Sequence, residues 1–243
     1  IGARLWCLAF ERTLNSLDSN RIFMDFDFSD ILIAEYQDKR ICTNVTDEYA
    51  SIVGMIATED NAQIFMMGDG GYGIQYKNGN YVLVEVVWED NKPFYPIYRT
   101  YDYDQYEVLS FNFRGSRNKP VKVITREFVP IVKSLNNINF NLLNKDNFNM
   151  IKEETTNHSF EEFENGYTKI FNIKEEEISA ISIFSDGLWS VDNRTLNQTI
   201  NDVFITNANE KTFVKDSMLE TLSVWQKRGV MPTDDFSMAN IFW

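Results

Sequence analysis

The stretch YASIVGMIATEDNAQIFMMGDGGYGIQYKNGNY, residues 49–81, decides the fold class of this chain. Apolar and polar residues alternate in it with the period of two that is typical of half-buried strands. Polar or glycine-rich turns interrupt the alternation, and the Asn78-Gly79 dipeptide of the last turn is a strong hairpin signal. Consecutive hairpins predict an antiparallel meander rather than βαβ units. We expect strands over residues 49–58, 62–67, 72–76 and 81–88.

Regular patterns on both sides of this stretch add helices and more strands. Apolar residues at helical spacing from Leu5 onward predict that the chain opens inside a helix that ends at residues 18–20, and Ser29 is the expected N-cap of a second helix. A third helix is expected over residues 210–228, where Lys227 suits the C-terminal dipole and Gly229 suits the stop. Further strands are expected over residues 106–113, 121–128, 178–184 and 236–243.

The region 136–171 differs in composition from the rest of the chain. It is rich in Asn, Glu and Lys with scattered Phe, which predicts an exposed, partly helical, flap-like excursion. We find no internal repeat and expect residues 1–243 to form one domain. The sheet-dominated pattern places this domain in the α+β class with mainly antiparallel sheet.

The composition excludes several kinds of partner. The formal net charge is −13, which argues against nucleic acid or an anionic membrane, because both need clustered Lys and Arg. No segment reaches the ~18 uncharged apolar residues of a membrane span. Cys7 and Cys42 form no metal-type pair, and we expect two buried thiols in a reducing compartment rather than a disulfide. A cytoplasmic protein is therefore expected, and the sequence does not give its oligomeric state.

Three turns share one pattern, in which an apolar strand-like run adjoins a turn that carries aspartate. They are MMGDGG around Asp69, FSDGL around Asp186, and PTDDFS around Asp234 and Asp235. A carboxylate at the end of an apolar strand costs desolvation free energy unless a partner compensates its charge. Carboxylate oxygens are preferred ligands of Mg²⁺ and Mn²⁺, so converging turns of this kind predict a divalent metal site. Each turn alone is also typical of a solvated hairpin, and this alternative stays open.

The order of these motifs resembles the metal-dependent protein phosphatase 2C family, in particular its divergent bacterial branch. In that family a strand leads into a Gly-Asp-Ser or Gly-Asp-Gly turn followed by a hairpin, as in residues 49–81. A strand that ends in Ser-Asp-Gly follows, matched here by ISIFSDGLWSV. An Asp-Asn or Asp-Asp before the last strand completes the order, matched by GVMPTDDFSMANIFW. The opening IGARLWCLAFERTL is similar to the helix after the family's first Asp-Gly motif, so the resemblance covers nearly the whole chain.

The resemblance implies a fold and a reaction. The fold is a four-layer α-β-β-α sandwich of two antiparallel sheets flanked by helices. The site is a binuclear Mg²⁺ or Mn²⁺ centre in which Asp186 and Asp234 bind metal. Asp69 matches a ligand of an accessory third metal, and Asp235, which stands where the family often has Asn, is expected to shape its turn. No side chain is the nucleophile, since a metal-bound water attacks the phosphoryl group of phosphoserine or phosphothreonine in a phosphoprotein substrate.

Two departures from the family pattern matter. The first Asp-Gly motif, an earlier acidic ligand and the phosphate-binding Arg would all precede Ile1, so we expect an N-terminally incomplete domain. Ser190 stands where family members often carry an acidic residue, which weakens the case for a third metal. A catalytically inactive, phosphatase-like binding or regulatory module is therefore the alternative. A structural domain with solvated acidic turns is the third interpretation.

His158 is the single histidine of the chain and lies in the polar region 136–171. A catalytic dyad or triad that depends on histidine has this one candidate and no supporting motif. The sequence therefore favours a surface histidine.

Overall fold

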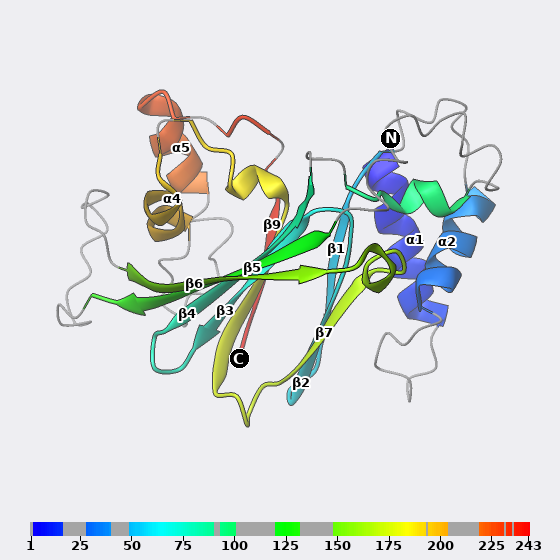
Figure 1. Ribbon diagram of the computed structural model, residues 1–243, viewed down its shortest axis with the longest axis horizontal. Coiled ribbons are helices and arrows are strands. Elements are labelled where there is room, and N and C mark those ends of the chain that lie inside the picture. The colour runs from blue at the N-terminus through cyan, green and yellow to red at the C-terminus, as the bar shows by residue number, and fades with distance from the viewer. Residues whose placement is uncertain are drawn as a thin grey trace. The chain divides into compact units, whose positions relative to one another are not determined.

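The computed structural model describes residues 2–16, 28–39, 49–89, 93–100, 120–131, 148–192, 194–203, 219–230, 232–234 and 236–243. These residues confirm the predicted α+β class, with one three-stranded and one six-stranded antiparallel sheet (Figure 1). The chain divides into two compact units. Unit 1 comprises Ile1–Gly71, Glu85–Ile124 and Thr155–Ile173, and unit 2 comprises Tyr72–Val84, Thr125–Glu154 and Lys174–Trp243. Within the described ranges, no helix is both long and apolar enough to cross a membrane.

The three-stranded sheet has the order β1-β2-β7. Its strands are β1 (Ile52–Ala57), β2 (Asn61–Met67) and β7 (Tyr167–Asn172). β1 and β2 form an antiparallel hairpin in which Ile52 lies opposite Met67. β2 also pairs antiparallel with β7, so that Ala62 lies opposite Phe171. β2 is therefore the central strand, and all of its residues after Asn61 are buried.

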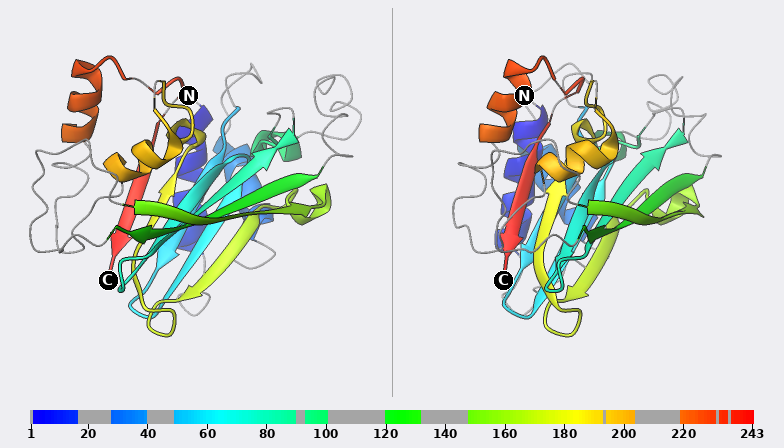
Figure 2. Two further views of the ribbon diagram at one scale, coloured as in Figure 1. Left: turned by 60° about the vertical axis from the view of Figure 1, so that its left-hand side comes forward. Right: turned by 90° about the vertical axis from the view of Figure 1, so that its left-hand side faces the viewer.

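The six-stranded sheet has the order β6-β5-β4-β3-β8-β9. Its strands are β3 (Gly70–Tyr76), β4 (Tyr81–Trp88), β5 (Val121–Pro130), β6 (Phe148–His158), β8 (Ile178–Phe184) and β9 (Met238–Phe242). The predicted hairpin joins β3 to β4, where the Gly79 N–H donates to the Tyr76 carbonyl at 2.9 Å. β8 and β9 pair antiparallel, with Phe184 opposite Met238 (Figure 2). β6 and β9 are consequently the two edge strands of this sheet.

Unit 1 packs two helices against strands of the three-stranded sheet. Helices α1 (Gly2–Ser16) and α2 (Phe28–Lys39) lie side by side in Figure 1. Trp6 of α1 stacks on Tyr36 of α2 with ring centroids 3.6 Å apart and an interplanar angle of 8°. Phe28 packs edge-on against Phe65 of β2 at 5.0 Å, so the helices and the sheet share one core. Full burial of a side chain the size of Phe contributes about 1.5–3 kcal/mol, which makes this aromatic core a main source of stability in unit 1.

Unit 2 packs helices α4 (Leu196–Val203) and α5 (Leu219–Lys227) with strands of the six-stranded sheet. Leu83 of β4, Phe184 of β8 and Trp225 of α5 are buried in this second core. The short 3₁₀ helix η6 (Asp186–Leu188) follows β8 and adds the fully buried Leu188 to the same core. Burial of Leu188 therefore anchors the turn that carries Asp186.

The chain leaves one sheet for the other at Gly68-Asp69, which corrects the predicted meander. β2 pairs with β1 and β7, whereas β3 pairs with β4 and β8, so the connection between β2 and β3 is a crossing and not a hairpin. The turn needs positive φ at Gly68 and Gly70, 96° and 131°, a region that residues with a Cβ rarely adopt. The Gly-Asp-Gly sequence cannot distinguish a crossing from a hairpin, because both use the same turn residues.

Other expectations also need correction. Ser29 is not the N-cap of the second helix, because α2 begins at Phe28, and the Ser29 hydroxyl instead accepts a hydrogen bond from Arg99 Nη1 at 2.8 Å. Cys7 is exposed on α1 rather than buried. The described part of the region 136–171 contains β6, the 3₁₀ helix η5 (Phe160–Glu162) and strand β7 where we expect a partly helical excursion. The expected strand over 106–113, Cys42 and the first part of the helix over 210–228 lie outside the described residues.

Replacing Gly68 with Ala should destabilise the protein more than replacing Gly79 with Ala. The two glycines have similar positive φ, 96° and 86°, so both variants carry a backbone strain of about 1–3 kcal/mol. A Cβ at Gly68 would meet Ser51 Oγ at 2.3 Å, whereas a Cβ at Gly79 meets nothing closer than Pro130 Cγ at 3.4 Å. Urea denaturation should therefore show a further loss of about 1–3 kcal/mol in the free energy of unfolding of Gly68→Ala. Equal losses in the two variants would contradict the described packing of the Gly68 turn.

Candidate metal centre

Asp186 lies where β8 ends and η6 begins. Phe184 is buried at the end of β8, and Ser185 is extended, with φ −76° and ψ 168°. The Trp189 N–H donates to the Asp186 carbonyl at 2.9 Å and closes the turn. Asp186 is half-buried, and Leu188 beyond it is fully buried. The strand end and the core below it therefore hold a partly exposed carboxyl group in a fixed place.

Hydrogen bonds connect this turn to the loop that precedes β9. At one end, the Ser185 N–H donates to the Ser237 carbonyl at 3.0 Å, and the Ser237 N–H donates to Ser185 Oγ at 2.9 Å. At the other end, the Thr233 N–H and hydroxyl donate to the Ser190 carbonyl at 2.6 and 2.9 Å. An antiparallel bridge adjoins this second end. The residues between the two ends of these loops are consequently held opposite one another.

Asp234 directly follows Thr233 in the second loop and is exposed to solvent. The structure thus places Asp186 and Asp234 in two loops of unit 2 that are hydrogen-bonded to each other. Asp235 lies outside the described residues. The binding of metal by these aspartates stays a prediction.

The donor set can be compared with what a divalent cation requires. Mg²⁺ is commonly held by one or two carboxylates, with water and substrate phosphate in the remaining positions of its octahedral shell. Asp186 and Asp234 are two such carboxylates, and the exposure of Asp234 gives water access to its loop. In the part of the chain that the structure describes, no group of three or more His, Cys, Asp and Glu side chains is placed to hold a metal ion. The described residues therefore offer no closed protein cage, and a two-carboxylate site open to water stays a prediction.

Trp189 connects the Asp186 turn to an arginine that the sequence analysis does not single out. Its ring packs edge-on against Phe184 at 5.3 Å, and the Arg126 guanidinium of β5 lies 5.4 Å from the ring centroid. Arg126 Nε also donates to Glu153 Oε2 at 2.6 Å, and the arginine side chain is only 11% exposed. Trp189 Nε1 is buried and has no hydrogen-bond partner among the described residues. An arginine in an alternating strand carries no local signal that could have identified Arg126.

Asp69 lies in unit 1, in the crossing from β2 to β3. Its backbone N–H donates to Ser51 Oγ at 3.0 Å, and the Ser51 hydroxyl donates to its carboxylate. Trp88 Nε1 donates to the Gly68 carbonyl at 2.8 Å and fixes the same turn. The half-buried Asp69 is thus held by protein groups, and its role as a ligand of an accessory metal stays a prediction.

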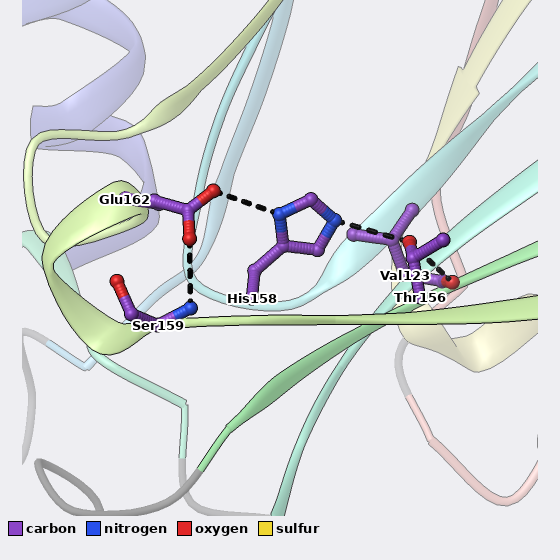
Figure 3. A network of polar contacts seen from close by, with 5 residues as sticks. All are labelled: Val123, Thr156, His158, Ser159 and Glu162. Atoms are coloured by element: carbon purple, nitrogen blue, oxygen red, sulfur yellow. Dashed lines mark hydrogen bonds and ion pairs between the residues drawn. The ribbon is translucent and has the colours of Figure 1, made fainter.

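A second polar network surrounds His158 in unit 1 (Figure 3). His158 Nδ1 lies 2.9 Å from Glu162 Oε2, and His158 Nε2 lies 3.0 Å from Thr156 Oγ1. The Ser159 N–H donates to Glu162 Oε1 at 2.9 Å, and the Thr156 hydroxyl donates to the Val123 carbonyl at 3.4 Å. The order carboxylate, imidazole, hydroxyl occurs in hydrolase triads. Here the carboxylate also caps the start of η5, so the network connects β6 to η5 as a structural contact.

Comparison with known proteins adds no relative. No family model matches the chain, and neither a curated protein nor a solved structure matches it. The function proposed below therefore depends on the residues and loops of this chain.

Replacing Ser185 with Ala should loosen the contact between the two loops. The variant loses the hydrogen bond from the Ser237 N–H to Ser185 Oγ, whose net contribution is about 0.5–1.5 kcal/mol. Amide hydrogen exchange at Ser237 should become faster by about 2- to 10-fold. Ser190→Ala is the matched control, because Thr233 binds the carbonyl of Ser190 and not its side chain. An unchanged exchange rate at Ser237 in Ser185→Ala would argue against the described contact.

The His158 network gives a pH dependence whose sign is fixed. The hydrogen bond from His158 lowers the pKa of the Glu162 carboxyl, and the bond from the Ser159 N–H lowers it further. Because this pKa is depressed on folding, Glu162 contributes stability above its unfolded pKa of about 4.3, and the contribution is lost as pH falls through the folded pKa. In an NMR titration of the side-chain carboxyl carbon, His158→Ala should raise the pKa of Glu162. Thr156→Val keeps the imidazole–carboxylate bond and should leave that pKa lowered, and a pKa unaffected by His158→Ala would exclude the pair.

Proposed function

We propose that this chain is a metal-dependent protein phosphatase domain of the phosphatase 2C type, acting on phosphoserine or phosphothreonine in a phosphoprotein substrate. The observation that carries the proposal is the hydrogen bonding of the Asp186 turn to the Asp234 loop at both ends. In the resemblance described above, these two aspartates are ligands of a binuclear Mg²⁺ or Mn²⁺ centre. Their position on facing loops of one unit supports that assignment.

The chain's own residues would hold the cation and keep the two aspartates in position. Asp186 and Asp234 would bind the cation. A divalent cation bound there supplies a water of lowered pKa and stabilises negative charge on a phosphoryl group. Pairing of β8 with β9 fixes the position of Asp186, and the bonds between Thr233 and Ser190 fix the loop that carries Asp234. Such fixed positions matter because a displacement of about 1 Å can cost about 100-fold in rate.

One neighbour of the Asp186 turn suits a ligand that offers an oxygen acceptor. The buried Trp189 Nε1 has no acceptor among the described residues, and a buried donor without a partner costs about 1–3 kcal/mol. A water or a phosphoryl oxygen beside the turn would satisfy it. The Arg126 guanidinium lies over the same ring, but its charge is already compensated by Glu153.

We also propose the layer architecture of the domain and its location in the cell. Unit 1 packs α1 and α2 on one sheet, and unit 2 packs α4 and α5 with strands of the other. Each unit thus supplies a helix layer and a sheet layer, which are the parts of a four-layer α-β-β-α sandwich. A cytoplasmic location fits the exposed free thiol of Cys7, because reducing compartments keep such thiols unpaired.

A catalytically inactive, phosphatase-like binding or regulatory module is the second candidate. One observation favours it. Among the described residues, no three His, Cys, Asp or Glu side chains lie together so that they could hold a metal ion. A centre with two metal ions needs more protein ligands than the two carboxylates of Asp186 and Asp234. Such a module would keep the paired loops for its fold and would lack turnover.

Asp186→Asn should abolish Mn²⁺-dependent hydrolysis of an aryl phosphate by the protein. It should also weaken Mn²⁺ binding to this chain by at least about 10-fold, since even residues that only orient metal ligands cost 10- to 100-fold when replaced. Asp234→Asn should act in the same direction. Isothermal titration calorimetry measures the affinity, and release of the aryl alcohol measures turnover.

Asp192→Asn is the matched control for these variants. Asp192 is exposed, directly follows the bridge that joins the two loops, and carries the same charge. Equal losses in Asp186→Asn and Asp192→Asn would mean that only overall charge matters, and the proposal would fail. Tight Mn²⁺ binding without turnover by the wild type would select the inactive module.

A further inference from the structure

β6 is an exposed strand at the edge of the six-stranded sheet. It is 11 residues long, and its one neighbour in the sheet order is β5 (Figure 1). All residues between its two ends are exposed, including the apolar Met150 at 46% and Ile151 at 59%. The outer edge of such a strand has a free row of backbone N–H and C=O groups that can pair with another strand. Among the described strands, none pairs with the outer edge of β6.

The side chains of β6 are self-complementary when two copies pair antiparallel about Glu153. In that register Lys152 of one copy lies opposite Glu154 of the other, and symmetry produces the same pair a second time. The register also places each exposed apolar side chain opposite a threonine, whose methyl group it can contact. All residues of the strand then take part in pairing.

Neighbouring registers lack this match. A shift by two residues in one direction places Lys152 opposite Lys152, and the opposite shift places Glu154 opposite Glu154. Like charges directly opposite one another destabilise a strand pair. A shift by one residue places the side chains of one face against those of the other face. The register about Glu153 has two opposite-charge pairs beside one like-charge pair, whereas each shifted register has a like-charge pair and no opposite-charge pair, so the charge pattern favours the register about Glu153.

The chosen register brings the two copies of Glu153 together, and Arg126 compensates their charge. Arg126 Nε donates to Glu153 Oε2 at 2.6 Å, so each central carboxylate carries its own guanidinium. On the other face, Lys152 Nζ lies 2.8 Å from Glu154 and 3.5 Å from Glu127 of β5. Lys152 thus already lies among carboxylates, and a second copy would add another.

We propose that β6 is a self-association surface, through which two copies of this chain join their six-stranded sheets edge to edge about a two-fold axis at Glu153. Pairing through one strand buries less than the ~1,200–2,000 Å² of a standard interface, so the dimer is weak and concentration-dependent. The net charge of −13 repels a second copy at long range, which makes the local charge match decisive. This association needs no metal at Asp186 and is independent of the phosphatase proposal.

Sedimentation velocity of the chain over a range of concentrations tests the proposal. The wild type should form a concentration-dependent dimer. Lys152→Glu and Glu154→Lys should each weaken it by at least about 10-fold, because each variant creates two like-charge pairs across the axis. The double variant K152E/E154K restores opposite charges and should return the dimer to near wild-type affinity. Both side chains are more than half exposed, 54% and 56%, so these variants should keep the fold.

Glu154→Lys separates a specific pairing from a general charge effect. It makes the acidic chain less negative, so dimerisation that depended on overall charge would become stronger. Lys169→Glu is the control for Lys152→Glu, because Lys169 is exposed on the edge strand β7 of the other sheet, and it should leave the dimer unchanged. A wild type that stays monomeric at every accessible concentration, or pairs only with a strand of another protein, would overturn the proposal. A dimer insensitive to both single variants, or a double variant no better than the single ones, would overturn it equally.

Discussion

The hydrogen bonds between the end of β8 and the loop before β9 are the constraint on which the candidate site depends. Two hydrogen bonds between Ser185 and Ser237 close one end of the facing loops, and an antiparallel bridge adjoins the other end. Asp186 directly follows the first end, and Asp234 directly follows Thr233 at the other end. The two loops can therefore separate only if these hydrogen bonds break. Two loops that are far apart in sequence are in this way held opposite one another, and a cation shared by Asp186 and Asp234 stays a prediction.

The core below the loops makes this constraint rigid. Leu188 and Phe184 are buried in the same cluster, and Trp189 adds its ring above them with Arg126 against its face. Asp69 lies in the other unit, where its carboxylate accepts a hydrogen bond from the Ser51 hydroxyl.

The sequence predicts those helices and strands whose burial produces a pattern of apolar and polar residues. β1–β5, β8 and β9 agree with the predicted strands to within a few residues, because short alternating or continuous apolar runs bounded by turn residues are typical of strands. β6 is exposed along nearly its whole length, so it has no alternation and is missed. α4 is missed because it is short and mostly polar. At the site, turn chemistry identifies Asp186 and Asp234 as candidates, but the bonds between their loops are tertiary and no local pattern contains them.

A titration of Mn²⁺ into isotope-labelled protein, followed by amide NMR, tests the shared cation site most directly. Mn²⁺ broadens the signals of nearby nuclei, so low amounts identify the residues around the ion. We predict that the amides of residues 185–190 and of Thr233 and Asp234 broaden first and together, and that Asp186→Asn removes this early effect. Broadening that affects only one of the two loops, or that begins in the acidic turn at residues 175–177, would contradict a cation shared by Asp186 and Asp234.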